Sequence, residues 1–70
     1  MKLITGQNIR KALEDGHIVY MEHSNFIERR LYRLNLENKT IEYKDYNKSW
    51  TKSSIEIEDM ISTNWIIEER

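Results

Sequence analysis

The chain has 70 residues, and its 11 lysine and arginine residues nearly balance its 12 aspartate and glutamate residues, for a net charge of −1 at pH 7. This balance disfavours binding to DNA or RNA, which draws much of its affinity from an excess of positive charge. The sequence contains no cysteine, so disulfides, thiolate nucleophiles and thiolate metal ligands are excluded.

A chain of this length forms one domain, residues 1–70, and buries only about 60% of the surface that its unfolded state exposes. Small domains often gain stability from disulfides, a metal or self-association. Cysteine is absent and the two histidines, His17 and His23, are too few for a zinc site, so we expect no metal and a homo-oligomer. No apolar run approaches the ~20 residues of a membrane span, and a signal peptide's apolar region is missing. We therefore expect a cytoplasmic protein.

The first element that the sequence predicts is a helix over Gly6 to Asp15. Thr5 is suited to cap its N-terminus, and Ile4 and Ile9 occupy the positions of a hydrophobic staple. Gly16 ends the helix, because glycine adopts the left-handed conformation without a steric penalty. The apolar stripe of this helix consists of Ile9, Ala12 and Leu13.

Two strands should follow this helix, because the sequence changes to β-branched and aromatic residues. The first covers His17 to Met21, and a longer one covers Phe26 to Leu36. Alternation along the longer strand predicts two faces. One carries Tyr32, Leu34 and Leu36, and the other carries Arg29, Leu31, Arg33 and Asn35.

The second half of the chain predicts a hairpin and a closing strand. Glu37 to Lys39 reads as the hairpin turn, with Asn38 as the residue that accepts a positive φ, before a partner strand over Thr40 to Tyr46. Ile55 and Ile57 alternate with glutamates as in a short strand. A helical turn near Glu58 to Ser62 then precedes a last strand, Trp65 to Glu68. The predicted fold class is α+β: one N-terminal helix packed on a small antiparallel sheet, with a short helical turn before the last strand.

Trp50 stands alone in a polar segment, residues 45–54. An isolated tryptophan among polar residues fills the core, seals a subunit interface or offers a stacking surface. The sequence leaves these three alternatives open.

The order of several segments resembles the phage Thoeris anti-defence 2-like family. The segments are Ala12 to Val19, an aromatic residue at Phe26, Trp50 with a polar spacer, and Asp59 to Glu68. In that family a helix ending in an Ala-Leu, charged, Gly pattern leads into a strand, and the chain closes on an acidic, apolar and tryptophan-containing segment. The sequence departs from the family pattern at Phe26, where tryptophan is usual, at Asn64, where an acidic residue is usual, and in a shortened middle.

The resemblance implies a small phage protein that forms an oligomer in the infected bacterial cell. It implies that the protein binds and sequesters a cyclic nucleotide immune signal of the cyclic ADP-ribose type without chemistry or a cofactor. The alternative is a protein–protein inhibitor of a host defence complex such as a CRISPR effector, with acidic strand edges and exposed aromatic residues as its interface. Some relatives in the family resemble anti-CRISPR proteins.

Sequestration of a nucleotide requires aromatic faces for the base, cationic donors for phosphates, and carboxylate or amide groups for ribose hydroxyls. Arg29 and Arg33 are the phosphate candidates, because a planar guanidinium suits phosphate geometry. Asn64 and Asp59 are candidates for hydroxyl groups. The aromatic candidates are Phe26, Tyr43, Trp50 and Trp65. We expect the ligand-binding set to be Phe26, Arg29, Arg33, Trp50 and Asn64.

Structural roles compete with these ligand-binding roles. Arg29 and Arg33 can form ion pairs with Glu28 or Glu42 on a solvated strand face. Trp65 is expected in the core, and Asp59 in the first turn of a helix. No catalytic triad, glycine-rich phosphate loop or metal-ligand cluster occurs in the sequence, so we expect no enzyme activity.

Overall fold

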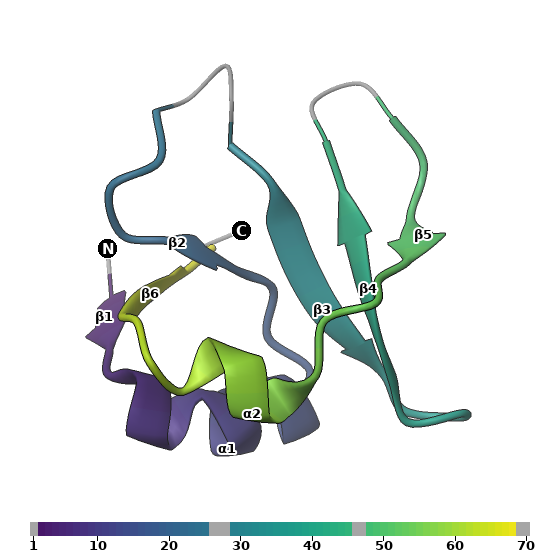
Figure 1. Ribbon diagram of the computed structural model, residues 1–70, viewed down its shortest axis with the longest axis horizontal. Coiled ribbons are helices and arrows are strands. Elements are labelled where there is room, and N and C mark those ends of the chain that lie inside the picture. The colour runs from purple at the N-terminus through teal and green to yellow at the C-terminus, as the bar shows by residue number, and fades with distance from the viewer. Residues whose placement is uncertain (1, 26–28, 46–47, 69–70) are drawn as a thin grey trace.

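The structure, a computed structural model, describes residues 2–25, 29–45 and 48–68. It confirms the predicted α+β class: two short helices and a single antiparallel sheet (Figure 1). In chain order the elements are β1 (Lys2–Ile4), η1 (Gly6–Asn8), α1 (Ile9–Glu14), β2 (Val19–Met21), β3 (Leu31–Asn35), β4 (Thr40–Lys44), β5 (Thr51–Lys52), α2 (Ile57–Met60) and β6 (Trp65–Ile67). In the described part of the chain, no helix is long and apolar enough to cross a bilayer.

The six strands lie in the order β1-β6-β2-β3-β4-β5, and every neighbouring pair is antiparallel. The closing strand β6 therefore lies inside the sheet, between β1 and β2, rather than at an edge. Lys2 faces Ile67 in the β1–β6 register, which brings the two ends of the chain together. The edges of the sheet are β1 and β5, which the sequence reading did not predict.

The N-terminal helical segment begins with a 3₁₀ turn, η1, before α1. The Thr5 side chain does not cap it, and this part of the prediction is wrong: the Thr5 hydroxyl instead accepts a hydrogen bond from the side-chain amide of Asn8 at 3.3 Å. A 3₁₀ turn closes through the Thr5 carbonyl, which accepts from the Asn8 backbone N–H at 3.0 Å. Gly16 adopts a φ of 88°, as predicted for the residue that ends the helix.

Both helices pack on one face of the sheet and enclose the core. The predicted stripe of α1 is buried, and Met60 of α2 joins it. Trp65 lies at the centre: its ring is 2% exposed, and its indole Nε1 donates to the Met60 carbonyl at 2.8 Å. Tyr32 packs edge-on against this ring, with the two ring centroids 5.3 Å apart. The core cluster comprises Ile9, Ala12, Leu13, Val19, Leu34, Ile41, Met60, Trp65 and Ile67.

The hairpin between β3 and β4 differs from the prediction in one residue. Lys39, not Asn38, has the positive φ, 62°. The side chain of Asn35 accepts from the backbone N–H groups of Glu37 and Asn38, and the Asn38 side chain accepts from the N–H of Thr40. Asn38 is thus engaged in an Asx-type turn, and the next residue takes the left-handed conformation.

Several predicted strands also differ from the observed ones, and β2 begins only at Val19. Residues 55–58 do not form a strand, because α2 begins at Ile57; Glu56 and Asp59 form a reciprocal capping box at its start. The helical turn therefore begins one residue earlier than predicted, and it ends at Met60 instead of Ser62. β3 begins at Leu31 and ends before Leu36, which is 47% exposed instead of facing the core with Tyr32.

Candidate functional site

The face of the sheet opposite the two helices, called the open face below, carries both arginines that were predicted to bind phosphate, Arg29 and Arg33. Because Tyr32 and Leu34 pack into the core, strand alternation directs Leu31, Arg33 and Asn35 to the open face. The register extends this face to β4 and β5, since Arg33 is opposite Glu42, and Glu42 is opposite Lys52. Its strand residues are Leu3, Tyr20, Leu31, Arg33, Asn35, Thr40, Glu42, Lys44, Lys52 and Ile66.

Charge is distributed unevenly over the molecule. Strands β3, β4 and β5 place three cations, Arg33, Lys44 and Lys52, and one carboxylate, Glu42, on the open face. The whole chain has a net charge of −1, so these strands concentrate positive charge that is not apparent from the composition.

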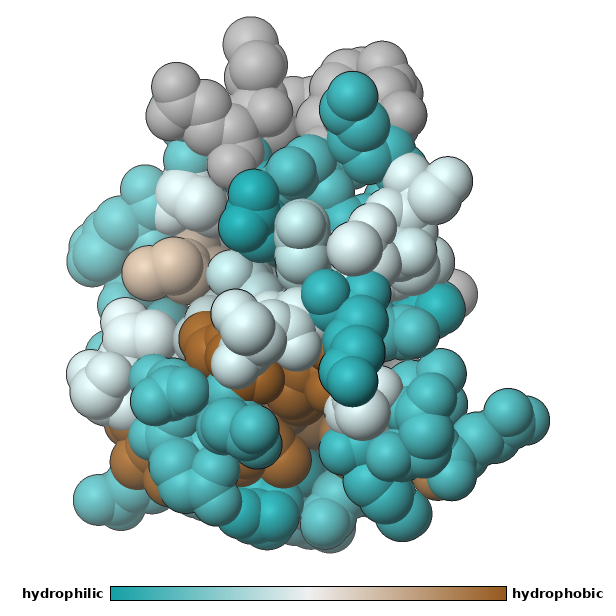
Figure 2. All heavy atoms as spheres, turned by 45° about the vertical axis from the view of Figure 1, so that its right-hand side comes forward, coloured by the Kyte–Doolittle hydropathy of each residue, from teal (hydrophilic) through white to brown (hydrophobic). Residues whose placement is uncertain are grey.

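The space-filling view shows that hydrophilic side chains cover most of the side that it presents, and that hydrophobic ones gather in one region of its lower half (Figure 2).

Arg33 and Trp50 form the best-defined unit on the open face. The Arg33 guanidinium carbon lies 4.1 Å from the centre of the Trp50 ring, and the Lys44 ammonium lies 5.9 Å from the same ring. Both distances are within the range of cation–π attraction. Trp50 is half-buried and is not a member of the core cluster. Of the alternatives open at the sequence level, the core position is therefore excluded.

Glu42 holds the Arg33 side chain in place. Its Oε1 accepts from Arg33 Nε at 2.9 Å, and its Oε2 accepts from the Asn35 side-chain amide at 3.3 Å. The hydrogen bond from Arg33, followed by the one from Asn35, is the largest cause of a Glu42 pKa below its usual value. The ion pair between Arg33 and Glu42 that the sequence suggested as a structural role is thus present. The hydrogen bond to Glu42 uses one of the five N–H groups of the Arg33 guanidinium and fixes the direction of the other four.

Arg29 shares the open face with Arg33 but occupies a different position. Its guanidinium carbon lies 3.9 Å from the centre of the Tyr20 ring. Tyr20 follows the core residue Val19 in β2, so alternation directs it to the open face. Arg29 was predicted to lie within the longer strand. In the structure it precedes β3 and is not a strand residue. The two arginines therefore each cover a separate aromatic ring.

Asn64 lies away from this unit. It precedes β6, and its side-chain amide donates to Glu22 Oε1 at 3.5 Å. The Asn64 backbone carbonyl accepts from the Glu22 backbone N–H at 3.4 Å. In the sheet, β2, β3 and β4 separate β6 from β5, the strand that follows Trp50. The structure thus does not place Asn64 with Arg33 and Trp50. Phe26, the remaining predicted ligand-binding residue, lies outside the described residues.

The other polar and aromatic candidates have structural roles. Asp59 lies in the first turn of α2, as expected. Its side chain accepts from the Glu56 backbone N–H at 3.0 Å and so caps this helix. Trp65 is buried in the core, also as expected. His17 and His23 are exposed. No group of three or more histidine, aspartate or glutamate side chains within the described residues could hold a metal ion.

Sequence reasoning missed a second arginine–aromatic unit, which lies on the helix-bearing face. The Arg30 guanidinium covers the Tyr43 ring at 4.3 Å and binds both carboxylate oxygens of Asp45, at 2.7 and 3.1 Å. The hydrogen bond from Arg30 is the main cause of the lowered pKa of Asp45. The hairpin pairs Leu31 with Lys44, so the next residues outward, Arg30 and Asp45, lie opposite each other. The opposite charges of these two residues at the end of a predicted hairpin were the signal available in the sequence.

Comparisons of this chain with protein-family models, with curated proteins and with solved structures find no match. The geometry of the open face is therefore the basis for a functional proposal.

Proposed function

We propose that this protein binds and sequesters a nucleotide through the unit formed by Arg33 and Trp50. The supporting observation is the Arg33 guanidinium, which is held by Glu42 and lies 4.1 Å from the Trp50 ring centre. A guanidinium fixed in this way donates to phosphate oxygens with little loss of side-chain freedom. A base would stack on the face of the Trp50 ring that the Arg33 guanidinium does not cover.

Further cations support an anionic ligand. Lys44 lies 5.9 Å from the Trp50 ring, and Lys52 is on the same face of the neighbouring edge strand. The resemblance to the phage Thoeris anti-defence 2-like family adds the class of ligand, a cyclic nucleotide signal of the cyclic ADP-ribose type. Retention of such a signal requires affinity alone, so the proposal includes no catalytic step. It places the protein in the cytoplasm of an infected bacterial host, as a homo-oligomer.

Calorimetric titration of the purified protein with cyclic ADP-ribose-type nucleotides tests this proposal. Substitution Arg33→Gln removes a charge-assisted hydrogen bond and should weaken binding at least about tenfold. Substitution Trp50→Ala removes the stacking surface and should weaken it by a similar factor. The matched control is Arg30→Gln, which removes the same charge and a comparable aromatic contact from the other face of the sheet. It should leave the affinity unchanged.

Mass spectrometry of material released on heat denaturation, after the protein has been exposed to an activated defence system, provides the second readout. An intact nucleotide released from the wild type and not from Arg33→Gln supports the proposal. The proposal is wrong if no nucleotide is retained, or if Arg33→Gln and Arg30→Gln bind equally well.

Inhibition of a host protein complex is the second candidate, and the free edge of the sheet favours it. Leu3, at the centre of edge strand β1, is 54% exposed. An exposed apolar side chain on an unpaired edge strand, such as Leu3, is suited to a protein partner. Co-purification of a host protein that is lost with Leu3→Glu, with no nucleotide in the complex, would support this candidate over the first.

A further inference from the structure

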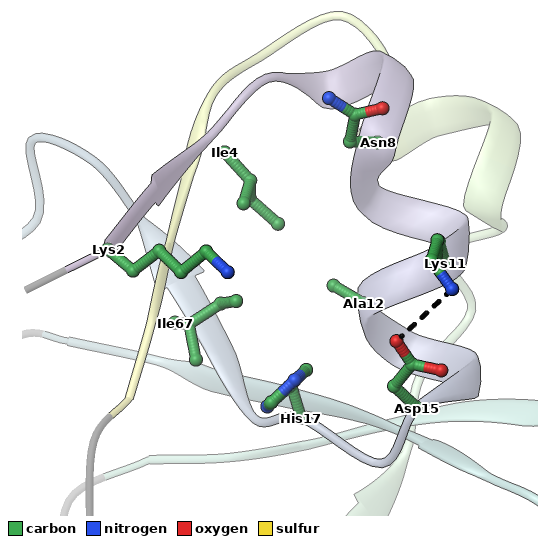
Figure 3. Close-up of a pocket in the computed structure, with 8 residues that line it drawn as sticks. All are labelled: Lys2, Ile4, Asn8, Lys11, Ala12, Asp15, His17 and Ile67. Carbon is green, nitrogen blue, oxygen red and sulfur yellow. Dashed lines mark ion pairs between the residues drawn. The ribbon is translucent and has the colours of Figure 1, made fainter.

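A pocket of about 250 Å³ opens between α1 and the β1–β6 edge of the sheet, on the helix-bearing side (Figure 3). Its apolar wall is formed by Ile4 of β1, Ala12 of α1 and Ile67 of β6. Ala12 and Ile67 are 7% and 8% exposed, so this wall is part of the core surface. Ala12 has the smallest side chain in the α1 stripe, and a larger residue there would extend into the space.

Charged side chains surround this apolar wall in an asymmetric arrangement. On the helix side, Lys11 is paired with Asp15, with 3.6 Å between Nζ and Oδ2. On the sheet side, the Lys2 ammonium and the His17 ring extend toward the opening (Figure 3). Lys2 has no ion-pair partner among the residues that the structure describes. The acidic group of the rim is therefore already paired, whereas a cation on the sheet side is available for an anion.

We propose that this pocket binds a small organic monocarboxylate. The apolar body of the ligand packs against Ile4, Ala12 and Ile67, and its carboxylate accepts hydrogen bonds from Lys2 and His17. An apolar cavity of about 150 Å³ is enough to hold benzene. The observed volume of about 250 Å³ therefore accommodates a benzoate-sized molecule with its carboxylate at the rim.

This site is separate from the nucleotide site proposed above. It lies on the helix-bearing side at the β1 edge, whereas Arg33 and Trp50 lie on the open face. Its volume is also below the range of about 300–1,000 Å³ that is typical of pockets for larger ligands. The small size and apolar wall favour a compact carboxylate over a nucleotide.

Titration of the ¹⁵N-labelled protein with benzoate, followed by amide chemical shifts, tests the inference. Saturable shifts are expected at Ile4, Ala12, His17 and Ile67. Benzamide has nearly the same shape without the charge, and it should bind at least about threefold more weakly. Substitution Lys2→Gln should weaken benzoate binding by a similar factor, whereas Lys52→Gln, which removes a lysine at the opposite edge of the sheet, should not.

A second variant tests the apolar wall. Substitution Ala12→Leu fills the space and should abolish the benzoate shifts. This result counts only if the variant keeps the dispersed amide spectrum of a folded protein. If the variant does not fold, Lys2→Gln remains as the test of the site. The inference is overturned if no saturation is seen by about 10 mM benzoate. Equal binding of benzamide and benzoate, or equal effects of Lys2→Gln and Lys52→Gln, would also overturn it. Trp50→Ala should leave the benzoate shifts unchanged, so failure of one site is distinguishable from failure of the other.

Discussion

Replacement of Trp65 by alanine should destabilise this protein strongly. The ring is 2% exposed, and truncation of a buried tryptophan costs about 3–5 kcal/mol. A 70-residue domain has a total free energy of unfolding of about 4–10 kcal/mol. The substitution should therefore remove about a third to all of the free energy of unfolding, and any folded fraction should unfold at a much lower urea concentration than the wild type.

Replacement of Trp65 by phenylalanine separates the hydrogen bond from the bulk of the ring. Phenylalanine keeps an aromatic side chain beside Tyr32 but cannot donate to the Met60 carbonyl, which accepts from the indole at 2.8 Å. Loss of the donor to a buried acceptor costs about 1–3 kcal/mol. The phenylalanine variant should fold, with a urea midpoint between those of the wild type and the alanine variant.

The measurement is urea unfolding followed by far-ultraviolet circular dichroism, because substitution of Trp65 changes the fluorescence signal itself. Trp50→Ala is the control, since Trp50 is half-buried and lies outside the core cluster. Loss of its cation–π contact should cost about 1 kcal/mol. If Trp65→Ala were no more destabilising than Trp50→Ala, the placement of Trp65 at the centre of the core would be refuted.

Other substitutions test the backbone and the ion pairs. A Cβ on Gly6 would overlap the backbone carbonyl of Ile61, so Gly6→Ala should cost about 3 kcal/mol or more in urea unfolding. Gly16 has open space around it but a φ of 88°, so Gly16→Ala should cost only about 1–2 kcal/mol, and equal losses for the two glycine variants would contradict this distinction. The pKa values of Glu42 and Asp45 are lowered in the folded state, so the unfolded state binds more protons and the stability that these ion pairs contribute should be lost as the pH falls below ~4. The double variant Glu42→Gln and Asp45→Asn should show a smaller loss over the same pH range in thermal melts, and an unchanged pH dependence would exclude these carboxylates as its source.

Features that depend on neighbouring residues were predictable from the sequence. The stripe of Ile9, Ala12 and Leu13 and the stop at Gly16 follow from helical periodicity and from the conformational freedom of glycine. The β3–β4 hairpin follows from alternation on both sides of a polar turn. These signals are local, and the structure reproduces them even where a boundary or the Thr5 cap differs.

Features that depend on distant residues were decided only by the tertiary structure. Ile55 and Ile57 alternate as in a strand, yet Ile57 begins α2, which is stabilised because Met60 packs against core residues from α1 and the sheet. Strand β1 has only three residues and exists because β6 pairs with it. Neither pairing nor packing over such separations leaves a signal in a short sequence window.

The candidate site shows the same division. Composition and strand alternation identified Arg33 as a phosphate candidate and suggested Glu42 as its partner. The stacking of Arg33 on Trp50, the distance between Trp50 and Asn64, and the pocket beside Ala12 all depend on the order β1-β6-β2-β3-β4-β5. Strand order is decided by which hydrophobic faces close the core, so the sequence by itself determined the local elements and the types of side chain, and the tertiary structure decided which of them meet.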